Sequence, residues 1–305
     1  MTDFSYSIGA GIRVGKRRMF VALALIIAVL ASVGCERAPT LERSNSVVYD
    51  RVVQRNELRV GYLVLPPLLV KETSTGKFSG IIYEFVEEMG RQLGLKVNWV
   101  EEVNLASMVS SLNSGKIDMV AFPLWRNTIR AKSMSFTAPL FYSTLGVYVR
   151  ADDARFDKDL SVLNDEAIRV STIDGEVAET IAKEDFPKAK YVALPQFSDY
   201  SQLLLQVQTG KADVTFFDKV LALQYLSKNP GKLKDVSGNK PIRVYAQTFI
   251  VPLGDSKFES MISNATAVMV ENGALDNGFK KYGMDLANFY RVATPYEIPA
   301  WARAK

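Results

Sequence analysis

The sequence has no histidine and only one cysteine among its 305 residues. Without histidine the chain cannot build a Ser-His-Asp triad, a histidine metal site or a histidine general base. With one cysteine it cannot form an internal disulfide. Catalytic and metal sites built on histidine are therefore excluded, and we expect no catalytic residues, no metal site and no cofactor.

The chain also lacks a charge excess once its first residues are set apart. Residues 1–34 hold four basic residues and one acid, which leaves 33 basic and 32 acidic residues in the remainder. A nearly neutral surface gives no electrostatic reason to bind a polyanion. We expect no nucleic-acid partner.

The longest apolar run, MFVALALIIAVLASVG at 19–34, follows a basic segment at 13–18 and ends in small residues. This order is typical of a secretory signal peptide. The run is shorter than the roughly 20 residues that a membrane span needs. A signal peptide at 1–34 is therefore predicted, and a retained N-terminal anchor is the alternative.

The apolar run ends at the sole cysteine, Cys35. The sequence Ser32-Val33-Gly34-Cys35 resembles a bacterial lipobox, although Ser32 stands where leucine is usual. We expect a lipid on Cys35 that holds the protein to the membrane, in the periplasm or at the cell surface. The alternative is a cysteine without a function.

Strand-like and helix-like segments alternate along the rest of the chain. Strands are predicted at 58–65, 96–100, 117–122, 168–172, 191–195 and 212–217, with helices at 81–94, 104–115 and 175–184 and a further helix ended by Gly210. A crossing strand at 242–254 and a helix at 256–273 that returns to the first half complete the pattern. Such alternation indicates a mostly parallel sheet covered on both faces.

Two segments of the chain are alike, SGKIDMVAF at 114–122 and TGKADVTFF at 209–217. Each ends a helix with Gly-Lys, places an aspartate one residue later, and enters an apolar strand. The likeness predicts two lobes of similar construction, and ordinary helix-to-strand punctuation is the alternative. Because parallel sheets bind ligands beyond the carboxyl ends of their strands, a cleft between two lobes is the expected site.

Six groups of residues, in this order and spacing, give the chain a resemblance to a known family. They are LRVG with the following PP, FSGIIYEFVEEMGRQLGLKV, SSLNSGKIDMV, RAKSMSFTAP, TGKADVTFFD and ENGALDNGFKKYG. From Leu58 to Gly283 the chain is similar to type II periplasmic solute-binding proteins of the polar-amino-acid branch, bacterial extracellular solute-binding protein family 3.

The resemblance implies an α/β fold of two lobes, a venus flytrap, in which each lobe is a mostly parallel sheet flanked by helices. It implies a first lobe at 57–148 plus 247–294 and a second at 149–246, after a tether at 35–56 and before a tail at 295–305. It also implies a function. A monomeric receptor binds a small polar, amino-acid-like solute between its lobes and delivers it to an ABC permease in the inner membrane.

The resemblance further implies which residues bind the ligand. Arg130 stands where family members grip a carboxylate with a bidentate guanidinium, and Asp218 where an acid pairs with the ligand ammonium. A surface ion pair for Arg130 and a helix N-cap for Asp218 are the alternatives. The other positions that match the family's site are Leu65, Leu105, Phe122, Trp125, Asn127, Glu176 and Val177.

Several of these positions depart from the family. Apolar Phe122 and Trp125 stand where hydroxyl groups are usual, and Glu176 lies at a helix N-terminus where the family binds an anion. In one account the ligand is not a standard α-amino acid, Trp125 and Phe122 stack on a larger or cationic group of the ligand, and Glu176 pairs with its positive charge. In the other, Glu176 pairs with Arg130, ligand binding is weak or lost, and the protein is a sensor or scaffold.

An enzyme and a sensory module are the other functional classes. This fold has been turned into a cyclohexadienyl dehydratase, in which a cleft carboxyl group acts as an acid, and Glu176 invites that comparison. A general acid needs a raised pKa, whereas a helix N-terminus lowers it, so we expect no enzyme. A peptidoglycan-cleaving relative would need a further catalytic domain, which we do not expect in a chain that ends at Lys305.

Overall fold

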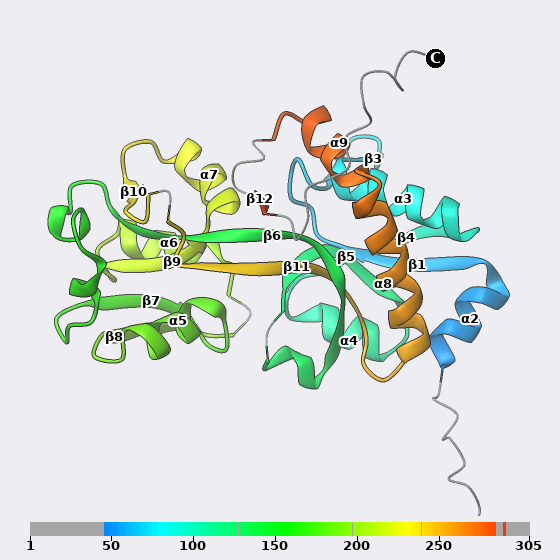
Figure 1. Cartoon of the computed structure of the whole chain (residues 1–305), viewed down its shortest axis with the longest axis horizontal. Helices are drawn as coiled ribbons and strands as arrows, with labels where there is room; N and C mark the ends of the chain where they lie inside the picture. Colours follow the sequence, from blue (N-terminus) through cyan, green and yellow to red (C-terminus); the bar gives the residue numbers. More distant parts are fainter. Residues whose placement is uncertain (1–45, 127, 197, 239, 285–288, 291–305) are drawn as a thin grey trace, which may run out of the picture. The chain divides into compact units, whose positions relative to one another are not determined.

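The computed structural model describes residues 46–126, 128–196, 198–238, 240–284 and 289–290 (Figure 1). The predicted signal peptide, Cys35, Asn127 and the tail at 295–305 lie outside the described residues. No helix within the described ranges is long and apolar enough to cross a membrane.

One large sheet runs through the described chain in the order β4-β1-β5-β11-β6-β9-β7-β8. Its strands are β1 (Glu57–Tyr62), β4 (Lys96–Glu102), β5 (Met119–Trp125), β6 (Met134–Arg150), β7 (Arg169–Ile173), β8 (Lys190–Leu194), β9 (Val214–Asp218) and β11 (Arg243–Pro252), with β10 (Leu233–Asp235) and β12 (Phe289–Tyr290) added to β6. A separate hairpin pairs β2 (Val70–Lys71) with β3 (Phe78–Ser79). The strands β4, β1 and β5 are parallel to one another, and so are β8, β7 and β9.

The helices divide between these two parallel groups. The first lobe, β4-β1-β5, carries α2 (Val47–Arg55), α3 (Ile81–Leu93), α4 (Ser107–Asn113), α8 (Ser256–Glu271) and α9 (Ala274–Lys281). The second lobe, β9-β7-β8, carries α5 (Val177–Asp185), α6 (Ser201–Gln208) and α7 (Lys219–Lys228). The predicted α/β fold with two lobes is confirmed, whereas the residues chosen as lobe boundaries stay a prediction.

The long antiparallel strands β6 and β11 join the lobes (Figure 1). They pair with each other from Met134 opposite Pro252 to Leu145 opposite Arg243, and β6 continues beside β9. The alternation of the sequence did not predict β6, which contains Pro139 and Gly146. Because both strands cross from one lobe to the other, the lobes cannot separate completely.

The hydrophobic core follows the same division. One buried cluster joins α3 to α8 and α9 over β1, and includes Ile82, Phe258 and Phe279. A second cluster joins β7 and β9 to α5 and α6, and includes Ile181 and Phe216. The predicted return of the chain from 256 onward to the first lobe is therefore confirmed.

The strand predicted at 117–122 is longer than expected and ends at Trp125. Proline lacks the N–H that a strand donates, so Pro123 predicts that the strand ends at Phe122. The pairing of β5 with β11 shifts register between Thr248 and Ile250, opposite this part of β5. An irregularity of this kind tolerates the proline, and the extra residues place Trp125 at the strand's carboxyl end.

Each lobe contains what we call an arginine–aspartate lock, a reciprocal pair of hydrogen bonds between an arginine of its first strand and an aspartate further along the chain. The Arg59 backbone N–H donates to Asp118 (2.7 Å) and the Asp118 N–H donates to the Arg59 carbonyl (2.7 Å). Arg169 and Asp213 make the same pair of bonds, at 3.0 and 2.7 Å. The likeness of 114–122 and 209–217 is therefore structural, as the sequence predicted.

Part of the segment predicted as a tether is folded. Residues 47–55 form α2, and Val52 is fully buried in the core of the first lobe. The Asp255 carboxylate accepts from the N–H groups of Val48 (2.8 Å) and Tyr49 (3.0 Å). The polar composition of 36–56 concealed this helix because only one of its faces packs on the lobe.

Candidate ligand-binding cleft

The candidate site lies where strands of both lobes reach their carboxyl ends. Trp125 closes β5, Asp218 closes β9, and Glu176 follows β7 at the start of α5. Arg130 begins a 3-10 turn soon after β5. Parallel strands bring their carboxyl ends to one edge, which is why residues so far apart in sequence meet here.

A buried ion pair joins the lobes at this edge. Arg130 Nη2 donates to Glu176 Oε1, and the two residues are only 6% and 2% exposed. The Tyr200 hydroxyl donates to Glu176 Oε2 (3.0 Å) and accepts from Arg130 Nη2 (3.2 Å). Each oxygen of the Glu176 carboxylate thus has a donor supplied by the protein.

Burial raises the pKa of Glu176, and the charge of Arg130 and the hydrogen bond from Tyr200 oppose that rise. The expectation that a helix N-terminus would lower this pKa was wrong. The Glu176 side chain does not cap α5, because it turns away from the helix toward Arg130. Burial therefore affects the pKa of Glu176 more than the dipole of α5 does.

The first turn of α5 has another internal carboxylate. Glu179 Oε2 accepts from the Gly175 N–H (2.8 Å), while Glu179 Oε1 accepts from Lys183 (2.6 Å). Gly175 has φ +74°, a left-handed conformation that favours glycine. Two glutamates at the start of α5 therefore accept hydrogen bonds from within the protein: Glu179 from the Gly175 N–H, and Glu176 from Arg130.

Asp218 caps α7. Its Oδ1 accepts from the N–H groups of Val220 (2.8 Å) and Leu221 (3.0 Å), which confirms the N-cap alternative for this residue. Asp218 is buried, and this burial raises its pKa, although the hydrogen bonds from the Val220 and Leu221 N–H groups oppose the shift. Both roles predicted for Asp218 remain compatible, because the residue also faces the cleft.

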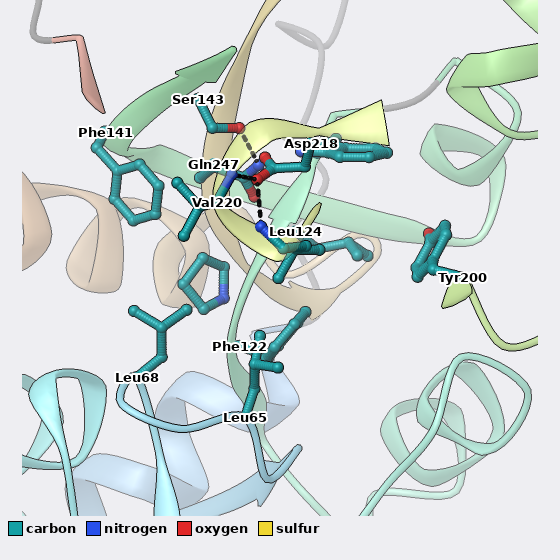
Figure 2. Close-up of a pocket in the computed structure, with 13 residues that line it drawn as sticks. Leu65, Leu68, Phe122, Leu124, Phe141, Ser143, Tyr200, Asp218, Val220 and Gln247 are labelled. Carbon is teal, nitrogen blue, oxygen red and sulfur yellow. Dashed lines mark hydrogen bonds between the residues drawn. The ribbon is translucent and has the colours of Figure 1, made fainter. Parts of the chain in front are cut away.

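A polar group of Ser143, Gln247 and Asp218 lies at one wall of a small apolar cavity of about 50 Å³. The Gln247 amide oxygen accepts from Ser143 Oγ (2.7 Å) and Trp125 Nε1, and its nitrogen donates to the Pro123 carbonyl (3.0 Å). Figure 2 shows Leu65, Leu68 and Phe122 on the opposite side of this cavity. The volume is far below the roughly 300 Å³ at which ligand pockets begin, so this cavity alone does not hold an amino acid.

A larger pocket of about 700 Å³ adjoins it. The first lobe contributes Leu65, Leu105 and Phe122, and the second lobe contributes Tyr200, Tyr225 and Lys228. Leu65, Phe122, Tyr200 and Leu221 line both spaces, which therefore lie next to each other. A volume of this size is typical of a site for a small molecule.

Residues 58–285 match the bacterial extracellular solute-binding proteins, family 3. The chain belongs to this family. The resemblance found in the sequence is confirmed, and the two-lobed architecture is the fold of the family's solute-binding proteins.

Two curated relatives show how widely the family's module is used. The L-cystine-binding protein TcyA of Bacillus subtilis is 23% identical over 89% of this chain and 99% of its own length. The membrane-bound lytic murein transglycosylase F of Yersinia enterocolitica is 30% identical over 80% of this chain. The chain spans only about half of the transglycosylase, 49% of its length, so the likeness concerns one part of that protein.

A solved structure of an ancestral amino acid-binding protein, AncCDT-1, a precursor of cyclohexadienyl dehydratase, has a similar fold. Its TM-score is 0.60 at 24% identity, covering 76% of this chain and 97% of that one. At this identity the likeness shows the fold alone.

The structure brings together most of the residues that the sequence named for the family's site. Leu65, Phe122, Trp125 and Asp218 line the small cavity, and Leu105 lines the larger pocket. Val177 is buried in the core cluster of the second lobe. Asn127 is outside the described residues, so its predicted role stays a prediction.

The sequence analysis missed Tyr200. Its ring lies 5.8 Å from that of Trp125, and its hydroxyl bonds both partners of the ion pair. Tyr200 follows β8 and precedes α6, so the rule of carboxyl strand ends could have found it. Across the described ranges, no group of three His, Cys, Asp or Glu side chains is placed to hold a metal ion.

Proposed function

We propose that this protein is an extracytoplasmic receptor that binds a small polar, amino-acid-like solute between its lobes and delivers it to an ABC importer in the inner membrane. The observation that supports the proposal most is the 700 Å³ pocket lined from both lobes. A receptor that closes on its ligand needs such a space, with walls that belong to separate bodies.

The same proposal covers the residues and the location. Trp125, Phe122, Leu65 and Leu105 supply apolar walls for the ligand, and Asp218 supplies negative charge at the pocket's end. A lipid on Cys35 holds the receptor at the membrane, near the permease. The membrane is reached through this anchor, and the protein binds its solute without chemical turnover.

The test begins with the natural ligand. Native mass spectrometry of protein purified without dialysis should reveal a bound small molecule of low mass. Titration calorimetry against amino acids, polyamines, opine-like compounds and short peptides should then give saturable binding with one site per chain. Silence of the whole panel, with no bound molecule, would reject the receptor function.

A sensory or degenerate module is the second candidate, and the ion pair between Arg130 and Glu176 favours it. This contact joins the two lobes through residues of the protein itself, which suits a module that only transmits a conformational signal. Neighbouring genes separate the candidates: a permease and an ATPase accompany an importer receptor, whereas a histidine kinase accompanies a sensor.

A further inference from the structure

Arg130 brings a cationic group to the place where the lobes meet, and its counterion is already part of the protein. The Glu176 carboxylate receives Arg130 on one oxygen and Tyr200 on the other. The contact is sealed from solvent, because Arg130 is 6% and Glu176 2% exposed. A guanidinium–carboxylate pair of this kind is what a carboxylate ligand would otherwise form with the arginine.

The lobes also touch beside this pair. A side-chain carbon built on Gly175 would lie 3.4 Å from Ile129 Cδ1, which is ordinary van der Waals contact. Ile129 immediately precedes Arg130, and Gly175 immediately precedes Glu176. The Ile129 side chain and the Gly175 backbone therefore lie close together beside the ion pair.

A ligand carboxylate that took the Nη2 donor of Arg130 would have to displace Glu176 from it. The displaced Glu176 would stay in its buried position without a cation, and an unpaired buried charge is strongly unfavourable. The nearby N–H of Gly175 offers no substitute, because Glu179 already accepts from it. Two donors suited to a ligand carboxylate, Arg130 Nη2 and the Gly175 N–H, therefore already bond to glutamates of the protein itself.

We propose that Glu176 is the built-in counterion of Arg130 and determines specificity, so that the cleft takes amino-acid-derived solutes that lack a free carboxylate. The ligand class rests on the receptor function proposed above, whereas the role of Glu176 does not depend on it. Amines and esters of this class meet the apolar walls of Leu65, Leu105 and Phe122 without competing for Arg130.

The role of Glu176 is tested by chemical rescue. In the Glu176→Ala variant Arg130 loses its carboxylate, and free acetate can take the vacated place. Acetate at about 100 mM should raise the melting temperature of Glu176→Ala by about 3 °C or more over sodium chloride of equal ionic strength. In the wild-type protein the same exchange of salts should change it by less than about 1 °C.

Two variants control the rescue. Glu184→Gln removes an acid from the same helix, but the Glu184 side chain is 64% exposed and lies outside the pair. It should respond to acetate as the wild-type protein does. The double variant Arg130→Met/Glu176→Ala should lose the rescue, since the cation is gone. An acetate response of Glu176→Ala no larger than that of Glu184→Gln overturns the counterion role.

The ligand class is tested on the wild-type protein, which requires no variant to fold. Matched pairs that differ only by the carboxylate are titrated: phenylalanine and phenethylamine, cysteine and cysteamine, lysine and cadaverine, arginine and agmatine. At least one amine should bind about tenfold or more tighter than its amino acid.

An amino acid that binds about tenfold tighter than its amine overturns the ligand class and leaves the receptor function standing. Failure of both members of every pair overturns the ligand class and counts against the receptor function. The acetate experiment still decides the role of Glu176 in that case, because it needs no knowledge of the natural ligand.

Discussion

The two lobes are alike where their first strands begin and unlike where the strands end. At the start, Asp118 and Asp213 hold Arg59 and Arg169 through matching backbone and side-chain bonds. At the carboxyl ends, the first lobe presents Arg130 and the second presents an acid, Glu176. The residues that the two lobes have in common therefore support the fold, and the residues that differ between the lobes lie at the cleft.

The largest expected effect comes from breaking the contact that distinguishes the lobes. Arg130→Met leaves Glu176 buried without a cation, and we expect the free energy of unfolding to fall by about 3–5 kcal/mol. Urea unfolding followed by circular dichroism measures it. The double variant Arg130→Met/Glu176→Leu should recover a large part of the loss, and a double variant as unstable as the sum of its singles would contradict a direct pairing.

The next effect concerns the repeated lock. Asp118→Ala and Asp213→Ala should each lower the free energy of unfolding by about 3 kcal/mol, because each removes a buried carboxylate bonded to at least two arginines. Urea unfolding of both variants compares them directly. Aspartate to asparagine at either position should cost less, since the amide oxygen still accepts from the backbone N–H. A large cost in one lobe and none in the other would show that the two locks are not equivalent.

A smaller effect is expected where two helices of the second lobe face the cleft. Asp218 caps α7, whereas Glu176 at the corresponding position of α5 turns to Arg130. Asp218→Ala should lower the free energy of unfolding by about 2 kcal/mol, because the helix loses its cap. Asp218→Asn should keep most of the free energy of unfolding of the wild-type protein, since asparagine also caps helices. Thermal unfolding of both variants measures the difference, and equal losses would argue against a capping role.

The sequence predicted what local spacing determines. The Gly-Lys and aspartate of 114–122 and 209–217 repeat within nine residues, and this was enough to foresee two similar lobes. Arg130, Asp218 and Glu176 were named through the family's pattern, and all three lie near the carboxyl ends of strands. Local spacing does not predict the partner of Glu176. The sequence left a positively charged ligand group and Arg130 as alternatives, and only the fold brings Arg130 to Glu176.

Other features depend on packing that no local pattern reveals. Tyr200 joins the ion pair only because β8 and α6 orient it toward the first lobe. β5 continues through Pro123 because β11 shifts register opposite it. Burial reverses the expected shift in the pKa of Glu176, and burial depends on how closely the lobes meet. In each case the deciding partner is more than 40 residues distant or in the other lobe.

The smallest expected effect is a pH dependence that arises from Asp213 in the second lobe. Burial would raise the pKa of Asp213, but hydrogen bonds from Arg169, Arg155 and Arg150 outweigh it, and the pKa lies below its usual range. A carboxyl group with a depressed pKa in the folded state stabilises the protein above its unfolded pKa of about 3.9, and this contribution is lost as the pH falls further. Wild-type protein should therefore lose stability between about pH 4 and pH 2 more steeply than Asp213→Asn. Urea midpoints measured across that interval test the difference, and parallel curves would mean that the arginines do not hold Asp213 ionised.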